Sequence, residues 1–192
     1  RLHRLAAALP GGRLFGALPL FALATKPFLP AWCFMWLMAF ALFLGCKWLT
    51  LGHALQRAGR ASPFRVLAYL FAWPGMEATR FLSRELAPRQ SRSATLGTIA
   101  VATVRILFGL FLLFVVARHA AAEPLLAGWI GMVGMVLLLH FGLFHLLSAG
   151  WRALRVDAPP IMNAPLRSAS VSEFWGQRGN AAFNDLALRL VF

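Results

Sequence analysis

The sequence predicts an all-α fold: a polytopic transmembrane helical bundle of about four spans, with an interfacial or re-entrant helix and a C-terminal helix on the cytoplasmic side. Three observations support this prediction. The 192 residues are 60% hydrophobic and only 13% charged, which leaves a soluble domain too little polar surface to cover its apolar surface. The apolar residues form runs long enough to cross a bilayer. The positive charges gather between those runs.

Four apolar runs are the candidate membrane spans. The runs 28–51, 95–117 and 125–151 are each long enough for a helix to cross the hydrocarbon core, which takes about 20 residues. The first run is shorter, and it crosses only if its helix covers residues 9–25 or if the bilayer thins locally. A three-span alternative, in which this first segment lies flat on the membrane, stays open.

The segment 62–82 reads differently from the spans. Its aromatic-rich run is broken by Pro74 and Gly75 and is flanked by Arg65 and Arg80. A run of this length, interrupted by a proline and bordered by charges, is typical of a helix that lies in the interface or enters the bilayer without crossing it. We therefore expect an interfacial or re-entrant helix here.

The loop charges predict the orientation. If the N-terminus is cytoplasmic and there are four spans, fifteen arginines in the segments 1–13, 57–92 and 152–189 all lie on the cytoplasmic side. Only Lys26 and Arg118 then lie outside. Because cytoplasmic loops carry the excess of positive charge, this topology is strongly favoured. The Ala- and Arg-rich, Lys-poor composition suggests a bacterial genome rich in G and C, so we expect the inner membrane.

Several kinds of site are not indicated. The net charge of +13 comes without a nucleic-acid recognition motif, so no nucleic-acid partner is expected. Cys33 and Cys46 lie too far apart along one presumed helix to form a disulfide. His140 and His145, five residues apart, lie roughly 140° apart around an α-helix and have no carboxylate nearby in sequence. We therefore expect no metal site.

The most unusual stretch is SVSEFWGQRGN, residues 170–180, which mixes polar and aromatic residues after a long apolar run. It follows a turn-rich connector, 158–165, that contains three prolines. Ser170 and Glu173 have the spacing of a capping box, so a helix is expected from Val171 to the end of the chain at residue 192. One interpretation is an amphipathic helix lying on the cytoplasmic face of the bilayer, with its polar side chains in water.

A resemblance gives a second interpretation. The segment 159–180, PPIMNAPLRSASVSEFWGQRGN, resembles the signature of the wax synthase branch of the membrane-bound O-acyltransferases: a Pro-rich stretch and a Ser-rich step, then Phe-Trp-Gly, Arg and Asn on a helix. The turn Pro74-Gly75-Met76 and the stretch His140-Phe-Gly142 are also similar to that family. The resemblance implies transfer of a fatty acyl group from acyl-CoA to a long-chain alcohol or another hydroxyl acceptor. Acyl-CoA is then a co-substrate, no cofactor is expected, and membrane lipids and a lipid alcohol are the partners.

The resemblance also implies roles for particular residues. Asn180 corresponds to an Asn beside the reaction chamber, where its amide orients the reacting groups or stabilises the oxyanion. The family's catalytic base is a His on a later transmembrane helix. The sequence ends twelve residues after Asn180, so we expect an N-terminal fragment without that His. Gly179 stands where the family usually has a second Trp, and this departure predicts either a locally loose helix or an altered pocket. The candidate substrate-binding residues are Phe174, Trp175, Gly176, Arg178, His140 and Arg105.

Two of these candidates lie inside apolar runs, and each has a structural alternative. Intramembrane His140 and Arg105 are functional candidates because polar groups inside a bilayer are rare and need partners. His140 can instead hydrogen-bond to a neighbouring helix, and Arg105 can pair with a structural partner. The cytoplasmic arginines have two explanations. They set the topology and bind anionic lipid, or they attract the phosphates of CoA.

Two further classes of protein stay open. A transporter or channel predicts polar residues along several spans or paired broken helices in two halves of the chain, and here only Pro74-Gly75 suggests a break. A structural membrane protein without catalysis leaves Asn180 exposed and replaceable. The sequence does not indicate the oligomeric state.

Overall fold

The computed structural model describes residues 11–58, 61–83, 85–88, 90–162 and 164–179. All regular elements in these ranges are helices, which confirms the predicted all-α class. Within them, three continuous helical stretches are long and apolar enough to cross a membrane: Ala31–Gln56, Arg92–His119 and Pro124–Ala153. Each contains most of one predicted span. The protein is therefore membrane-embedded.

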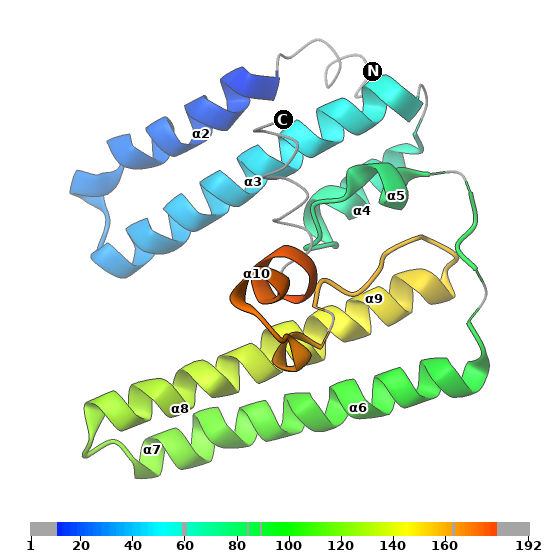
Figure 1. Ribbon diagram of the computed structural model, residues 1–192. Coiled ribbons are helices and arrows are strands. Elements are labelled where there is room, and N and C mark those ends of the chain that lie inside the picture. The colour runs from blue at the N-terminus through cyan, green and yellow to red at the C-terminus, as the bar shows by residue number, and fades with distance from the viewer. Residues whose placement is uncertain (1–10, 59–60, 84, 89, 163, 180–192) are drawn as a thin grey trace. The chain divides into compact units, whose positions relative to one another are not determined.

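The described residues form two compact units of packed helices. Among the described residues, the first unit extends to Glu85 and the second begins at Leu86. Each unit has its own helical hairpin (Figure 1).

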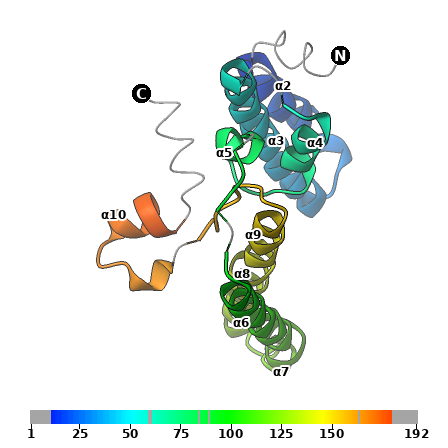
Figure 2. The same cartoon turned by 90° about the vertical axis from the view of Figure 1, so that its right-hand side faces the viewer.

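In the first unit, α2 (Gly11–Ala24) and α3 (Ala31–Ala58) form an antiparallel hairpin, and the two views agree in placing them side by side (Figures 1 and 2). They are joined through the short 3-10 helix η1 (Lys26–Phe28). Thr25 Oγ1 donates to Ala22 O at 2.7 Å and closes the end of α2. The described part of α2 is shorter than the predicted span 9–25, whose first two residues lie outside the described residues.

The expected helix over 62–82 is two short helices, α4 (Pro63–Phe71) and α5 (Ala78–Leu82). The break at Pro74-Gly75 is thus confirmed. Pro63 occupies the first turn of α4, where its missing N–H is not needed. Pro74 has no N–H to continue a helix, so the chain between α4 and α5 runs as an irregular segment with carbonyls that need donors.

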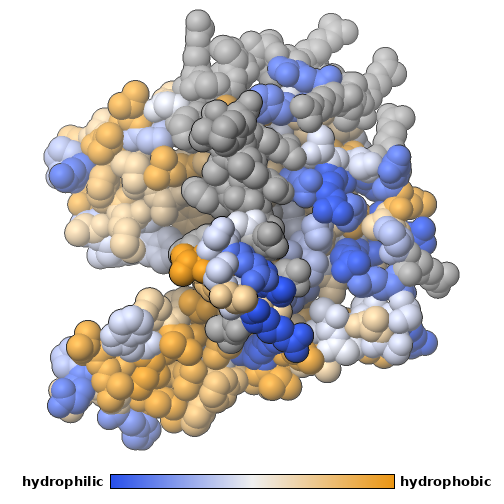
Figure 3. Space-filling view, viewed as in Figure 1, coloured by the Kyte–Doolittle hydropathy of each residue, from blue (hydrophilic) through white to orange (hydrophobic). Residues whose placement is uncertain are grey.

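The second unit is built on a longer hairpin. One arm consists of α6 (Arg92–Phe111), the π-helical segment η2 (Leu112–Val116) and α7 (Ala117–His119); the other consists of α8 (Pro124–Val136), the π-helical segment η3 (Leu137–Leu143) and α9 (Phe144–Ala153). Ser91 caps α6 by accepting from the amide of Ala94 at 3.2 Å. Large apolar side chains such as Leu107, Phe114 and Trp129 are exposed along both arms. Figure 3 shows hydrophobic residues over much of this hairpin's visible face and hydrophilic residues at its turn, a pattern suited to contact with lipid.

Glycines allow the two arms to meet closely. A Cβ atom on Gly109 would lie 2.7 Å from Gly134 O, and one on Gly142 would lie 2.4 Å from Cγ1 of Ile106. At Gly109 the backbone of the facing arm occupies the space that a side chain needs, and at Gly142 the Ile106 side chain occupies it. Small residues at a helix crossing are a common means of close packing in membranes.

After α9 the chain reverses. Arg155 takes a left-handed conformation, with φ of 63°, and its carbonyl accepts from the amide of Ala87 at 3.1 Å. Three short elements follow the Pro-rich connector: the 3-10 helix η4 (Pro165–Arg167), the single turn α10 (Val171–Glu173) and the π-helical segment η5 (Phe174–Arg178). The predicted helix 171–192 therefore begins as a π-distorted turn, and its remainder lies outside the described residues.

Candidate functional site

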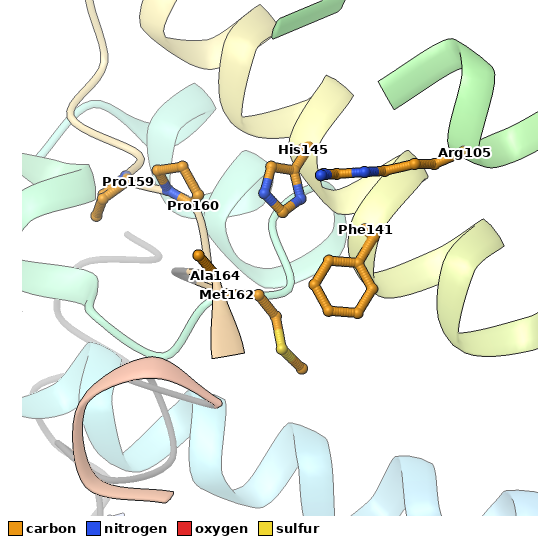
Figure 4. Close-up of a pocket in the computed structure, with 7 residues that line it drawn as sticks. All are labelled: Arg105, Phe141, His145, Pro159, Pro160, Met162 and Ala164. Carbon is orange, nitrogen blue, oxygen red and sulfur yellow. The ribbon is translucent and has the colours of Figure 1, made fainter. Parts of the chain in front are cut away.

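A pocket of about 450 Å³ lies in the second unit, beside the two arms of the hairpin. It is lined by Arg105 of α6, Phe141 of η3, His145 of α9 and four residues of the connector: Pro159, Pro160, Met162 and Ala164 (Figure 4). This volume lies in the range of small-molecule sites, which is about 300–1,000 Å³. The pocket therefore combines an apolar wall, one cation and one imidazole.

Arg105 lies near the middle of the apolar helix Arg92–His119 and is half-buried. Its Cζ atom is 5.6 Å from the centroid of the Phe141 ring, within reach of a cation–π contact. No hydrogen bond or ion pair joins its guanidinium to the described part of the chain. A guanidinium has five N–H donors and stays charged, so Arg105 presents an unused cationic fork to the pocket.

His145 points its ring at the same pocket (Figure 4). Its Nδ1 is 3.0 Å from the carbonyl oxygen of His140. Because a carbonyl oxygen only accepts hydrogen bonds, Nδ1 carries the hydrogen and Nε2 is the free acceptor. The ring also stacks on Phe141, with centroids 6.3 Å apart and planes at 25°. These contacts fix both the tautomer and the orientation of His145.

His140, the candidate that the sequence indicated, does not line this pocket. Its ring meets Phe144 edge-on at a centroid distance of 5.2 Å. Its Nδ1 is buried and has no hydrogen-bond partner among the described residues. The structure thus brings the side chains of Arg105 and His145 to one pocket and leaves the His140 ring outside it. The π-helical segment η3 also replaces the uninterrupted α-helix on which the 140° separation of the two histidines was predicted.

The connector supplies the remaining wall of the pocket. Ser148 Oγ, buried on α9, donates to Ala158 O at 2.6 Å and anchors the connector where it begins. Beyond it, Pro159 and Pro160 restrict the backbone dihedral φ and leave the chain without regular structure. Ala164 adopts a left-handed conformation, with φ of 45°, immediately before η4. The wall of the pocket therefore leads directly into the segment that carries FWGQRGN.

That segment begins with the predicted capping interaction, with one difference. Ser170 Oγ accepts from the amide of Glu173 at 3.0 Å, as a capping box requires. The Glu173 carboxylate, however, accepts from the amide of Ala169 at 2.8 Å rather than from that of Ser170. It also accepts from Nε of Arg178 at 2.5 Å. The amide of Ala169 and the Arg178 guanidinium together hold the pKa of Glu173 below its ordinary value.

The motif residues can now be placed. Phe174, Trp175, Gly176 and Arg178 all lie in η5, and Phe174, Gly176 and Arg178 do not line the pocket. Arg178, a predicted substrate-binding residue, already gives its Nε to Glu173. Asn180, the predicted catalytic residue, lies outside the described residues.

Gly179 closes the described part of the motif. Its amide donates to the carbonyl of Phe174 at 2.5 Å, and a Cβ atom there would lie 2.6 Å from that same oxygen. In this conformation the position has no room for the Trp that the resembled family carries. The sequence therefore departs from the family pattern at a residue whose size the backbone restricts.

A second intramembrane cation, Lys47 of α3 in the first unit, was missed in the sequence. Its side chain is 0% exposed, and its Nζ donates to the carbonyls of Tyr69 at 2.9 Å, Trp73 at 2.5 Å and Gly75 at 2.5 Å. The ammonium also lies 3.7 Å from the centroid of the Tyr69 ring. An ammonium has three donors, and all three are used, so Lys47 fastens the broken segment to α3. The only feature of the sequence that could have indicated Lys47 is that it is one charged residue within a long apolar run.

Thr50, Tyr69, Trp73 and Phe81 form a buried cluster around Lys47. Thr50 Oγ1 lies 2.7 Å from the hydroxyl of Tyr69 and donates to Lys47 O at 2.9 Å. The Phe81 ring packs against both Tyr69 and Trp73, with centroids 5.7 and 6.0 Å away. The cluster of Lys47, Thr50, Tyr69, Trp73 and Phe81 is therefore buried, and the Lys47 ammonium in it has all three donors bonded.

Within the described residues, no three or more His, Cys, Asp or Glu side chains converge as a metal site would need. Cys33 and Cys46 are free thiols. No family model matches the chain, and no curated protein or solved structure is significantly similar to it. The chemistry of the two units is therefore the basis for any functional assignment.

Proposed function

We propose that this chain is part of a membrane-bound O-acyltransferase that moves a fatty acyl group from acyl-CoA to the hydroxyl of a lipid. One observation carries the proposal. The Pro-rich connector, which begins the segment resembling the wax synthase signature, lines the same pocket as Arg105 and His145. Residues that the sequence singled out for separate reasons, Arg105 and the connector, thus contribute to one cavity.

The chemistry needs few groups. The acceptor hydroxyl attacks the thioester carbonyl, a new C–O bond forms and the C–S bond breaks. The hydroxyl proton passes to a base, and the CoA thiolate takes up a proton as it leaves. Nε2 of His145 is an acceptor that can orient the hydroxyl, and the donors of Arg105 can meet an oxygen on which negative charge is present or develops.

The other motif residues enter this proposal through the resemblance alone. Asn180 is proposed as the amide that orients the reacting groups, and the turn at Phe174–Gly179 as the element that positions Asn180. The proposed setting is the bacterial inner membrane, with the motif on the cytoplasmic side, where acyl-CoA is found. The loop charges support this orientation.

The test is an acyl-transfer assay of the full-length protein in membranes, with labelled acyl-CoA and a panel of lipid hydroxyl acceptors. We expect ester formation that falls about 10²-fold or more in Asn180→Ala and His145→Ala. His119→Ala is the matched control, because His119 also bonds its Nδ1 to a carbonyl, that of Val115 at 2.8 Å, but is exposed at the end of α7. Absence of ester with every acceptor, or wild-type rates in both variants, would refute the proposal.

A further inference from the structure

We infer that the pocket binds a lipid whose headgroup carries an anion, a phosphate or a carboxylate, next to a free hydroxyl. Arg105 holds the anion and His145 holds the hydroxyl. That such a lipid is the acyl acceptor rests on the proposed function, whereas its binding does not.

The anion follows from Arg105. A charged side chain within an apolar helix is costly unless it is paired or faces a polar cavity. Two cations described above have partners inside the protein: Nε of Arg178 lies 2.5 Å from the Glu173 carboxylate, and the three donors of Lys47 bond to carbonyls. Arg105 has no such partner among the described residues, and it faces the pocket. The planar guanidinium matches phosphate and carboxylate with two parallel hydrogen bonds.

The hydroxyl follows from His145. With Nδ1 committed to the carbonyl of His140, only the acceptor Nε2 is left for a ligand. A ligand group that meets it therefore has to be a donor, and a lipid hydroxyl is such a donor. Figure 4 shows the Arg105 guanidinium extending toward the His145 ring. An anion and a hydroxyl on the same headgroup can therefore reach both side chains.

The rest of the pocket agrees with this ligand. Among the described residues no acidic side chain lines it, and its apolar walls include Phe141, Met162 and the two prolines. The connector is irregular backbone next to a residue in mid-helix, and such backbone at membrane depth is tolerated only inside protein or beside a polar cavity. The pocket thus has room and polarity for a headgroup. The exposed apolar side chains of the hairpin, including Val104 and Leu107, provide a surface for the acyl chains.

The experiment is a ligand-binding titration of the purified full-length protein in neutral detergent, read as the shift of its thermal unfolding. Four ligands separate the two headgroup features. Phosphatidylglycerol has both the anion and hydroxyls, phosphatidylethanol has the same anion without a hydroxyl, and monoacylglycerol has hydroxyls without an anion. Free CoA brings phosphates without a lipid. We expect phosphatidylglycerol to bind most tightly, about fivefold or more above phosphatidylethanol, which matches one lost hydrogen bond.

The variants assign each feature to its residue. Arg105→Ala is expected to weaken phosphatidylglycerol at least about tenfold, and Arg105→Lys, which keeps the charge without the planar fork, to fall between it and the wild type. His145→Ala is expected to bring phosphatidylglycerol down to the level of phosphatidylethanol. Arg118→Ala, which removes an exposed cation from the same helical arm, is expected to change nothing.

Several outcomes would overturn the inference. The first is equal affinity of the wild-type protein for phosphatidylglycerol and phosphatidylethanol. The second is an Arg105→Lys variant that binds phosphatidylglycerol no better than the wild-type protein binds monoacylglycerol. The third is a thermal shift with free CoA that disappears in Arg105→Lys. If Arg105→Ala does not fold, the affinities of Arg105→Lys and Arg118→Ala for phosphatidylglycerol are compared instead, and Arg105→Lys has to bind it more weakly than Arg118→Ala. Selective binding without any ester product refutes the proposed function alone. Ester formation without this selectivity refutes the present inference alone.

Discussion

The two intramembrane cations, Lys47 in the first unit and Arg105 in the second, present opposite solutions to one physical problem. Lys47 is completely buried and donates three hydrogen bonds to three backbone carbonyls. Arg105 is half-buried, lines a pocket and meets only the face of Phe141 within the described residues. Both lie in long apolar helices, so hydropathy alone does not separate them.

The difference teaches that a count of donors and acceptors distinguishes a structural charge from a functional one. A saturated ammonium has nothing left to offer a ligand. A guanidinium without protein partners keeps its charge and all its hydrogen-bonding capacity. It is tolerated inside an apolar helix because it faces a polar cavity. The comparison makes predictions that differ in size between the two units.

The largest expected effect is from Lys47→Met. It leaves the carbonyls of Tyr69, Trp73 and Gly75 without their donor in a buried site, which we expect to lower the free energy of unfolding by about 3–5 kcal/mol. Unfolding in detergent, followed by circular dichroism, measures this loss. Lys26→Met, which removes an exposed lysine of the same unit, serves as the control and should stay within about 0.5 kcal/mol of the wild type. Equal stabilities for the two variants would show that Lys47 does not fasten the broken segment.

The next effect concerns the hairpin that carries Arg105. In Gly109→Ala the new methyl group would lie 2.7 Å from the carbonyl of Gly134, and backbone cannot move aside as a side chain can. We expect a loss of about 1–3 kcal/mol in unfolding free energy.

Gly97→Ala is the matched control on the same helix, because no atom lies within 4 Å of its Cβ position. There the substitution should stabilise the helix by about 0.5–1 kcal/mol, since glycine is a poor helix former. A destabilisation of the same size at both positions would mean that the close approach of the arms has no energetic importance.

A smaller effect is expected from Tyr69→Phe. This change removes the 2.7 Å hydrogen bond between the Tyr69 hydroxyl and Thr50 Oγ1 but keeps the ring beneath the Lys47 ammonium. Because Thr50 retains its bond to the Lys47 carbonyl, we expect a loss of about 1 kcal/mol. Chemical denaturation of the two proteins side by side provides the measurement, and a loss as large as that of Lys47→Met would contradict the central role of the ammonium.

The smallest effect belongs to a partly exposed ion pair, that of Arg178 with Glu173, which adds a third kind of cation to the comparison. The pKa of Glu173 is lowered from 4.5 by the amide of Ala169 and the guanidinium of Arg178. A lowered pKa means that the contribution of Glu173 to the order of this turn is complete above pH 4.5 and is lost as the pH falls through the lowered value. A carboxyl NMR titration should show this midpoint below the ordinary one, and Arg178→Gln should move it upward. A midpoint at or above 4.5 would contradict the observed contacts.

The helices and their breaks were predictable because they depend on local composition. The runs 28–51, 95–117 and 125–151 fall largely within the observed membrane helices, Pro74-Gly75 breaks the segment between α4 and α5, and Ser170 begins a helical turn. These features follow from hydropathy, from the missing N–H of proline and from the spacing of a cap.

The site was predictable only in part. Arg105 was visible as a charge in an apolar run, but its neighbour His145 was not chosen, because an ideal α-helix gives no reason to prefer it to His140. The π-helical segment η3 and the returning connector determine that the ring of His145, and not that of His140, lines the pocket, and both depend on tertiary packing. Lys47 was equally visible as a residue, but its three acceptors lie 22 to 28 positions away in sequence, beyond any local pattern.

The most direct test of the central claim is the acyl-transfer rate of full-length protein carrying Arg105→Met, expressed per mole of folded protein, with the unfolding midpoint measured on the same sample. An Arg105 reserved for a ligand predicts a rate at least about tenfold below that of wild type, with a midpoint equal to that of wild type. A wild-type rate, or a loss of stability like that of Lys47→Met, would contradict the claim.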